Sequence, residues 1–166
     1  RLAQRGDKHI IASGITPSGE FHIGHLREIL TGDMVTRACK DAGMDAEFVF
    51  IVDSADPLRK VYPFLSDEYE KYIGCPLALI PAPDEDGNPS DSGISYAQYF
   101  LDPFLKALEQ IDVRPRIIDN YESYSNGKFA ERARIVCENP DKIREIIERV
   151  SGRELSDNWF PFNPYG

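Results

Sequence analysis

His22 and His25 stand on either side of Gly24, in a run from Ser13 to His25 whose residue types and spacing are suited to chemistry. An apolar strand over residues 9–13 enters this run, and an amphipathic helix begins near Gly24. The amino terminus of a helix offers unpaired N–H groups and a partial positive charge, which favour a bound anion. Imidazole nitrogens there can donate to phosphate oxygens as charge spreads in an in-line displacement. The pattern makes ATP chemistry the leading hypothesis.

The loop before the histidines fits the same hypothesis. Ligands of open parallel α/β sheets bind beyond the carboxyl ends of the strands, and Thr16 and Ser18 lie in that region. Gly14 and Gly19 permit turns that other residues resist, while Pro17 stiffens the loop between them. The loop is therefore built from residues that can bring backbone close to a ligand.

Gly24 carries no side chain at the point where a flat base would have to approach the backbone. A glycine-rich turn with two surface histidines is the plainer interpretation. Two histidines that bracket a glycine at a strand–loop–helix junction nevertheless favour a nucleotide site. The sequence has neither the G-x-G-x-x-G run of dehydrogenases nor the G-K-[ST] of a P-loop, so those two nucleotide folds are poorer fits.

The elements around this run predict an α/β fold with a parallel sheet. A helix is expected over residues 24–42, and Gly43 suits the position just past its end. A second apolar strand follows over residues 47–52, which predicts a right-handed β-α-β unit. The apolar face of the helix is expected to consist of Leu26, Ile29, Leu30, Val35, Ala38 and Cys39.

Less regular sequence follows the second strand. A loop holds Asp53 and Asp56, a short helix is expected over residues 67–72, and residues 81–95 form an irregular excursion. A helix over 96–111 has the apolar stripe Tyr99, Phe100, Phe104, Leu105 and Leu108, and a third strand covers 116–119. The last helix starts at Asn139 as N-cap and Pro140, runs to about Val150, and turns Ile143, Ile146, Ile147 and Val150 inward.

Composition excludes several classes of protein. The 166 residues suffice for one domain, and the net charge of −9 argues against DNA and against general nucleic-acid binding. Arg59-Lys60 and Arg132/Arg134 are the candidate basic patches, with solvated surface charge as the plainer interpretation. No apolar run is long enough for a membrane span, and no signal peptide is evident. Cys39, Cys75 and Cys137 lack metal-site spacing and fit a reducing cytoplasm.

The longer string around the histidines resembles the class I lysyl-tRNA synthetases, which are found mainly in archaea and some bacteria. His22-Ile23-Gly24-His25 is similar to the "HIGH" signature of class I aminoacyl-tRNA synthetases and related nucleotidyltransferases. The resemblance rests first on Ser13 to Gly19 and His22 to Glu28, which are highly specific. It continues in order at Asp53 to Val61, Tyr72 to Leu77, Ser95 to Ala97 and Asn158 to Pro161, and so covers nearly the whole chain.

The resemblance implies a Rossmann-like parallel sheet of the HUP type. The chain would be a single domain over residues 1–166, the first half of that fold with part of a helical insertion, and a further insertion would begin in the tail 158–166. In the parent enzyme, ATP and lysine react to give lysyl-adenylate and pyrophosphate, with Mg²⁺ as cofactor. Lysine then passes to tRNA(Lys) through the full-length enzyme.

The resemblance also implies roles for individual residues. His22 and His25 are catalytic and contact the ATP phosphates, while Gly24 lies against adenine. Asp53 and Asp56 attract the ammonium groups of the substrate or hold Mg²⁺, although an ordinary strand-end turn cap explains them equally well. Apart from these two, no metal ligand is expected. The implied ATP-binding residues are Thr16, Pro17, Ser18, Gly19, His22, Gly24 and His25, and the implied substrate-binding residues are Gly14, Thr16, Asp53 and Asp56. Arg27 and Glu28, one turn into the helix, are expected to have a helix-stabilising or packing role and not a chemical one.

The sequence departs from the family pattern in two ways. Many members have Asn in place of His25, and either side chain can donate to phosphate. The second signature of class I enzymes, the lysine-containing "KMSKS", does not occur here, nor do the metal-binding insertion and the anticodon-binding region. Because the chain also opens at Arg1, we expect it to be part of a longer protein.

Three properties are expected of such a part. Adenylation by the chain alone should be negligible, ATP binding should be weak and dependent on the histidines, and an apolar face should be exposed where the second half of the fold docks. The aromatic tail either covers part of that face or is a disordered end; its members are Trp159, Phe160, Phe162 and Tyr165.

Two other functions stay open. One is a small HxGH nucleotidyltransferase that makes an activated acid or a CDP-linked compound, which would need a compensating basic residue such as Lys128 or Arg132. The other is a non-catalytic nucleotide-binding or regulatory module, which fits the acidic net charge and the missing second signature.

Overall fold

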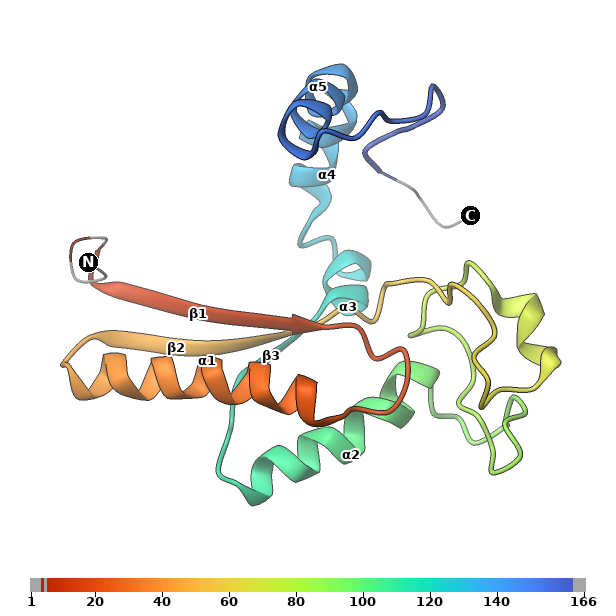
Figure 1. Cartoon of the computed structure of the whole chain (residues 1–166), viewed down its shortest axis with the longest axis horizontal. Helices are drawn as coiled ribbons and strands as arrows, with labels where there is room; N and C mark the ends of the chain where they lie inside the picture. The colour runs from red at the N-terminus through yellow and green to blue at the C-terminus, as the bar shows by residue number, and fades with distance from the viewer. Residues whose placement is uncertain (1–3, 5, 163–166) are drawn as a thin grey trace. The chain divides into compact units, whose positions relative to one another are not determined.

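The computed structural model describes residue 4 and residues 6–162 of the chain. The chain divides into two compact units at Tyr121, and each unit is described by itself. The first unit holds a parallel sheet (Figure 1) of β1 (Lys8–Ile15), β2 (Asp45–Val52) and β3 (Arg116–Asp119). β2 pairs with both other strands, in the order β1-β2-β3. The predicted α/β class and its parallel β-α-β unit are confirmed.

Helix α1 (Ile23–Asp41) connects β1 to β2, and Gly43 follows its C-cap with a φ of 78°, as the sequence predicted. The predicted inward face is partly wrong, because Val35 and Ala38 are exposed. Gly32 and Thr36 take the inward positions between Ile29 and Cys39. These four residues follow the helical period, which turns Val35 and Ala38 away from the sheet. At Gly32 the ring of Phe48 on β2 lies so close that a Cβ would be 2.4 Å from its Cε2.

Helix α2 (Tyr96–Gln110) packs on the same sheet face as α1, as Figure 1 shows. Its Phe104 and Leu108 join Ile29 of α1 in a core with the β2 side chains Phe48, Phe50 and Val52. Alternate residues of a strand point to one face, so both helices cover the same side of β2. Tyr99 was expected in the apolar stripe of this helix, but it lies 43% exposed at the surface.

The segment between β2 and α2 builds a second core. The predicted short helix is a 3-10 turn, η2 (Asp67–Tyr72), and residues 81–95 form turns with isolated bridges at Pro81–Ser95 and Pro83–Pro89. Leu58, Leu65, Tyr69, Leu77 and Ile80 of this segment pack with Tyr96, Ala97 and Phe100 from the start of α2. This core holds the first turn of α2 beside the loop that follows β1.

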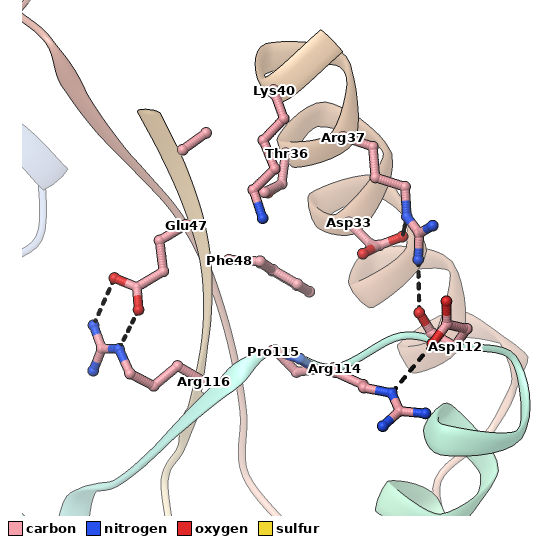
Figure 2. Close-up of a pocket in the computed structure, with 11 residues that line it drawn as sticks. Asp33, Thr36, Arg37, Lys40, Glu47, Phe48, Asp112, Arg114, Pro115 and Arg116 are labelled. Carbon is pink, nitrogen blue, oxygen red and sulfur yellow. Dashed lines mark hydrogen bonds and ion pairs between the residues drawn. The ribbon is translucent and has the colours of Figure 1, made fainter. Parts of the chain in front are cut away.

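At the amino-terminal edge of the sheet, charged residues join α1 to the loop before β3, and β3 to β2 (Figure 2). Arg37 contacts Asp33 at 2.6 Å and donates to the Asp112 carbonyl at 2.6 Å. Arg116 holds both carboxylate oxygens of Glu47, and its hydrogen bond lowers the pKa of that carboxyl. These side chains line a pocket of about 530 Å³. They are solvent-exposed ion pairs, which contribute little to stability.

The second unit contains the end of α3 (Asn120–Ser125), then α4 (Ala130–Cys137) and α5 (Pro140–Ser151). The sequence predicted neither α3 nor α4. Helix α5 begins at Pro140 as expected, but the Asn139 side chain does not cap it and instead donates to the Ile135 carbonyl at 2.8 Å. The predicted inward face is also wrong in part, because Ile146 is 40% and Val150 77% exposed.

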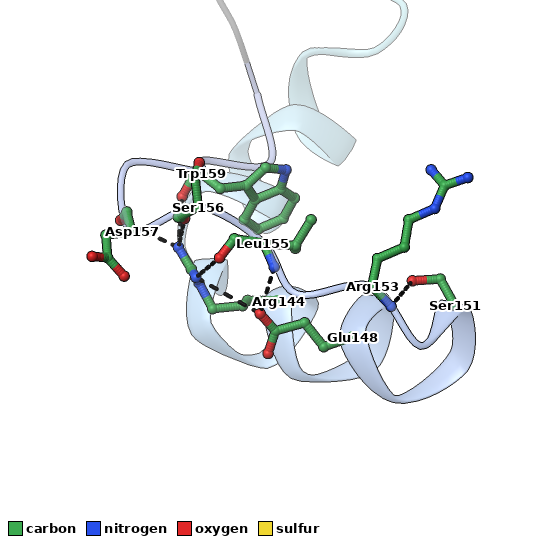
Figure 3. Close-up of polar contacts among 8 residues, drawn as sticks. All are labelled: Arg144, Glu148, Ser151, Arg153, Leu155, Ser156, Asp157 and Trp159. Carbon is green, nitrogen blue, oxygen red and sulfur yellow. Dashed lines mark hydrogen bonds and ion pairs between the residues drawn. The ribbon is translucent and has the colours of Figure 1, made fainter.

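Arg144 organises the segment after α5 (Figure 3). Its guanidinium donates to the carbonyls of Leu155 and Ser156 and lies 5.8 Å from the centre of the Trp159 ring. The tail is therefore folded back onto α5 as far as Trp159. Tyr165, which the sequence grouped with this tail, lies outside the described residues.

Two broad expectations can be compared with the described residues. No described helix combines the length and apolar character that a membrane crossing requires. Ile10 on β1, an outer strand of the described sheet, is an apolar side chain that is 61% exposed, and the expected docking face stays a prediction.

Candidate functional site

The loop after β1 is held in place by a hydrogen bond within the loop and by another from α2. Ser18 N–H donates to the Thr16 carbonyl at 2.8 Å, which closes a tight turn around the buried Pro17. The hydroxyl of Tyr96 donates to the Ser18 carbonyl at 2.8 Å. Tyr96 is fully buried at the start of α2, and burial raises its pKa, so it stays a neutral donor. The second core thus fixes the loop that leads to the histidines.

His22 and His25 cap the start of α1 reciprocally. His22 is the N-cap residue, and its Nδ1 accepts the N–H of Gly24 at 3.1 Å. The Nδ1 of His25 accepts the N–H of His22 at 3.0 Å. The two rings are stacked with centroids 3.9 Å apart, and Phe21 lies 5.2 Å from the His25 ring. This is the arrangement of a capping box, built here from two imidazoles.

Gly24 has a structural role that the sequence did not suggest. A Cβ at this position would lie 2.8 Å from Cε1 and 2.9 Å from Nδ1 of His22. Such separations are too short for real contacts, so a side chain here would displace the His22 ring. The glycine is therefore needed by its neighbouring imidazole, and its predicted contact with adenine stays a prediction.

The environment of the His25 ring favours its neutral form. The pKa of His25 is lowered, first by partial burial of the ring and then by the nearby His22, while Glu28 acts in the opposite direction. Glu28 is itself held by the hydroxyl of Ser13 at 2.7 Å, which joins β1 to the first turns of α1. This contact agrees with the helix-stabilising role expected for Glu28.

A second group of predicted residues gathers at the carboxyl ends of β1 and β2. The Thr16 hydroxyl donates to Oδ2 of Asp56 at 2.8 Å, and Arg59 lies 3.4 Å from the same oxygen. Asp53 N–H donates to the Ile15 carbonyl at 3.0 Å, which continues the pairing of the two strands. Thr16 and Asp56 are thus brought together as expected.

Asp53 is the most perturbed carboxyl of this group. Its Oδ1 accepts a short hydrogen bond from Nδ2 of Asn120, and its Oδ2 lies beside Gly14, 3.7 Å from where a Cβ would be. Burial raises the pKa of Asp53, as does the charge of Asp56, while the Asn120 bond lowers it. A partly buried carboxylate in such a position can neutralise an ammonium group.

Sequence reasoning missed the residues that support this edge. Asn120 follows β3, and Ser54 donates to Asp119 at 2.7 Å while accepting the N–H of Tyr121 at 3.2 Å. All of these lie where neighbouring parallel strands end, which is the signal that could have identified them. Within the described residues, no hydrogen bond or ion pair joins this group to the histidine pair, and no cluster of three or more potential metal ligands occurs.

Comparison with known proteins gives consistent matches over this chain. The model of the family described as "tRNA synthetases class I (K)" matches residues 1–166. A lysine–tRNA ligase of Methanosarcina barkeri is 44% identical over 163 residues, 98% of this chain and 29% of that protein. The Archaeoglobus fulgidus enzyme of the same name is 44% identical over 163 residues, 98% of this chain and 32% of that protein. The lysine–tRNA ligase of Methanocaldococcus jannaschii is 42% identical over 160 residues, which are 96% of this chain and 29% of that protein. This chain therefore spans less than a third of the length of these relatives.

Proposed function

Because the chain belongs to the class I (K) family of tRNA synthetases, we propose that residues 1–166 are the amino-terminal part of the catalytic domain of a lysine–tRNA ligase. The family implies the use of ATP. In the whole enzyme the carboxylate of lysine attacks the α-phosphorus of ATP, pyrophosphate leaves, and the lysyl group of the resulting adenylate is transferred to tRNA(Lys).

The capped start of α1 is the observation that carries this proposal. His22 and His25 each use Nδ1 for a backbone bond, so their Nε2 atoms remain for a ligand. Together with the positive end of the helix dipole they provide donors for the phosphates of ATP. Thr16, Pro17, Ser18 and Gly19 form the loop wall of the same proposed ATP site.

The carboxyl edge of β1 and β2 supports the lysine part of the proposal. Asp53 has its Oδ2 beside Gly14, which has no side chain, and Asp56 is oriented by Thr16. Two carboxylates and a small residue at a strand end suit a substrate with two ammonium groups. We assign lysine binding to Gly14, Thr16, Asp53 and Asp56.

A magnesium ion fits this proposal only as a partner of the nucleotide. The described residues contain no cluster of three or more metal ligands, so a metal cage is not part of the proposal for this region. Mg²⁺ is commonly held by substrate phosphates with one or two carboxylates, and we propose that it enters with ATP.

Calorimetric titration of the chain with ATP tests the proposal. We expect His22→Ala to weaken ATP binding by roughly 10- to 100-fold, because a charge-assisted hydrogen bond contributes roughly 1.5–3 kcal/mol. His9→Gln is the matched control, since His9 is the remaining histidine and lies on β1, paired with Ala46 near the start of β2. Equal ATP affinity in the parent and in His22→Ala would remove the assignment.

A further inference from the structure

The two hydrogen bonds at the start of α1 determine which ring nitrogen carries the proton. An imidazole nitrogen that accepts a hydrogen bond cannot be protonated, so a neutral ring with an accepting Nδ1 has its hydrogen on Nε2. Nδ1 of His22 accepts from Gly24, and Nδ1 of His25 accepts from His22. Both rings therefore have one tautomer compatible with the structure.

We propose that His22 and His25 lock each other as Nε2–H tautomers, so that the start of α1 presents two fixed, neutral N–H donors. The His25 ring accepts the backbone N–H of His22, and the His22 ring accepts the backbone N–H of Gly24. The two rings are stacked with their centroids 3.9 Å apart. Only the identification of the bound anion as a triphosphate rests on the proposed function. The lock itself is a property of the chain without ligand.

The lock follows from the needs of the helix as well as from ring chemistry. The first N–H groups of a helix have no partner within the helix, and one side-chain cap typically stabilises by about 1 kcal/mol. Here two such groups, those of His22 and Gly24, are satisfied by the imidazoles. Turning either ring to the other tautomer would point a hydrogen at an N–H donor and leave that donor unpaired.

Protonation of either ring would break the same bonds. An imidazolium carries hydrogens on both nitrogens, so it cannot accept from the backbone. The charged or titratable groups that act on His25 are His22, which disfavours its protonation, and Glu28, which favours it. Phe21, which packs on the His25 ring from the preceding loop, is uncharged. The pair therefore recognises phosphate through geometry and neutral donors.

Nitrogen NMR of the ¹⁵N-labelled chain without nucleotide tests the proposal. We expect His22 and His25 to show Nδ1 at the chemical shift of an unprotonated imidazole nitrogen and Nε2 at that of a protonated one. His9 provides the third histidine signal as an internal comparison. A protonated Nδ1 on either residue, or the averaged shifts of a free imidazole, would overturn the lock.

Variants at position 25 test whether the histidines act on each other. Asn at this position retains a carbonyl oxygen that can accept the His22 N–H, so His25→Asn should keep the His22 nitrogen shifts of the parent. His25→Leu removes the acceptor, and we expect the His22 shifts to move toward a tautomer average. Unchanged His22 shifts in His25→Leu would contradict the mutual lock; the parent spectrum tests the tautomers even where that variant unfolds.

Adding ATP separates this proposal from the proposed function. Perturbation of both Nε2 signals on ATP addition supports phosphate binding by the locked pair. Locked tautomers that do not respond to ATP would leave the lock intact and contradict the nucleotide assignment. Histidine signals that respond to ATP but show mixed tautomers would support the nucleotide assignment and contradict the lock.

Discussion

The hydroxyl of Thr16 donates to Oδ2 of Asp56 over 2.8 Å and so connects the loop after β1 to the loop after β2. The two residues are 40 positions apart in the sequence, and the bond is partly buried. Its position at the carboxyl edge of the sheet means that one interaction contributes both to the fold and to the orientation of a proposed lysine-binding carboxylate.

Replacing this hydroxyl should destabilise the first unit measurably. Thr16→Val removes the donor with little change of shape, and we expect a loss of about 1 kcal/mol in the free energy of unfolding, the usual value for such a bond. Urea unfolding followed by circular dichroism measures it. Thr31→Val is the control, since its hydroxyl only donates within α1 to the exposed Arg27 carbonyl. Equal losses of unfolding free energy in the two variants would mean that the Thr16–Asp56 hydrogen bond does not stabilise the first unit.

Asp53 should oppose folding when it is ionised. Burial raises its pKa above the ordinary 3.8, so the folded protein prefers the protonated carboxyl. Its favourable contribution is present below the unfolded pKa and is lost as the pH rises through the folded pKa. We expect Asp53→Asn, which keeps an acceptor for Asn120, to be more stable than the parent at pH 7 and to lose this advantage as the pH falls toward 3.8.

Unfolding curves of Asp53→Asn between pH 3 and pH 7 test this dependence. Asp91→Asn removes an exposed carboxylate outside the site and should show no such gain at neutral pH. A carboxylate that is retained at a cost in stability is a candidate functional group. We therefore expect the stabilised variant to have weaker lysine binding in a full-length enzyme, and unaltered binding there would remove Asp53 from the site.

Gly32 should not tolerate even one added methyl group. Alanine favours a helix over glycine by about 1 kcal/mol, but here the new Cβ would lie 2.4 Å from the Phe48 ring. Overpacking of this kind costs roughly 1–3 kcal/mol, so Gly32→Ala should be destabilising on balance. Phe48→Leu removes the ring, and a double-mutant cycle should show that the two changes compensate in part. Additive losses would mean that the methyl group at position 32 is not strained against the Phe48 ring.

The predicted elements were those with strong local patterns. Continuous apolar runs located β1 and β2 to within two residues, and α1 was marked by its loop, its length and Gly43. The histidine cap also lies within four consecutive residues, so local sequence could locate it. What local sequence could not show is the reciprocal bonding of the two rings.

The errors came from shape and from distant contacts. Val35 and Ala38 have the apolar character of inward residues, but the helical period puts Gly32 and Thr36 inward, and only a glycine fits against the Phe48 ring. Asn120 meets Asp53 across 67 residues, and Tyr96 meets Ser18 across 78. Such partners become visible only once the strand order is known. Short helices such as α4 have too few turns to show a clear period.

Gly24→Ala should separate ligand binding from stability. Alanine improves helix propensity by about 1 kcal/mol, and displacement of the His22 ring loses a cap of similar size, so the free energy of unfolding should change little. The Cβ would stand 2.8 Å from Cε1 of His22, so the ring must leave its position and its Nε2 must leave the anion site. We expect ATP affinity to fall about tenfold in calorimetric titration.

The double variant His22→Ala with Gly24→Ala identifies the cause of that loss. If the added methyl acts by moving the imidazole, removing the imidazole first leaves it nothing to displace, and the double variant should bind ATP as weakly as His22→Ala and no more weakly. A further loss in the double variant would mean that the methyl group obstructs the nucleotide itself, as contact between Gly24 and adenine requires. The two explanations of this glycine therefore predict different affinities for one protein.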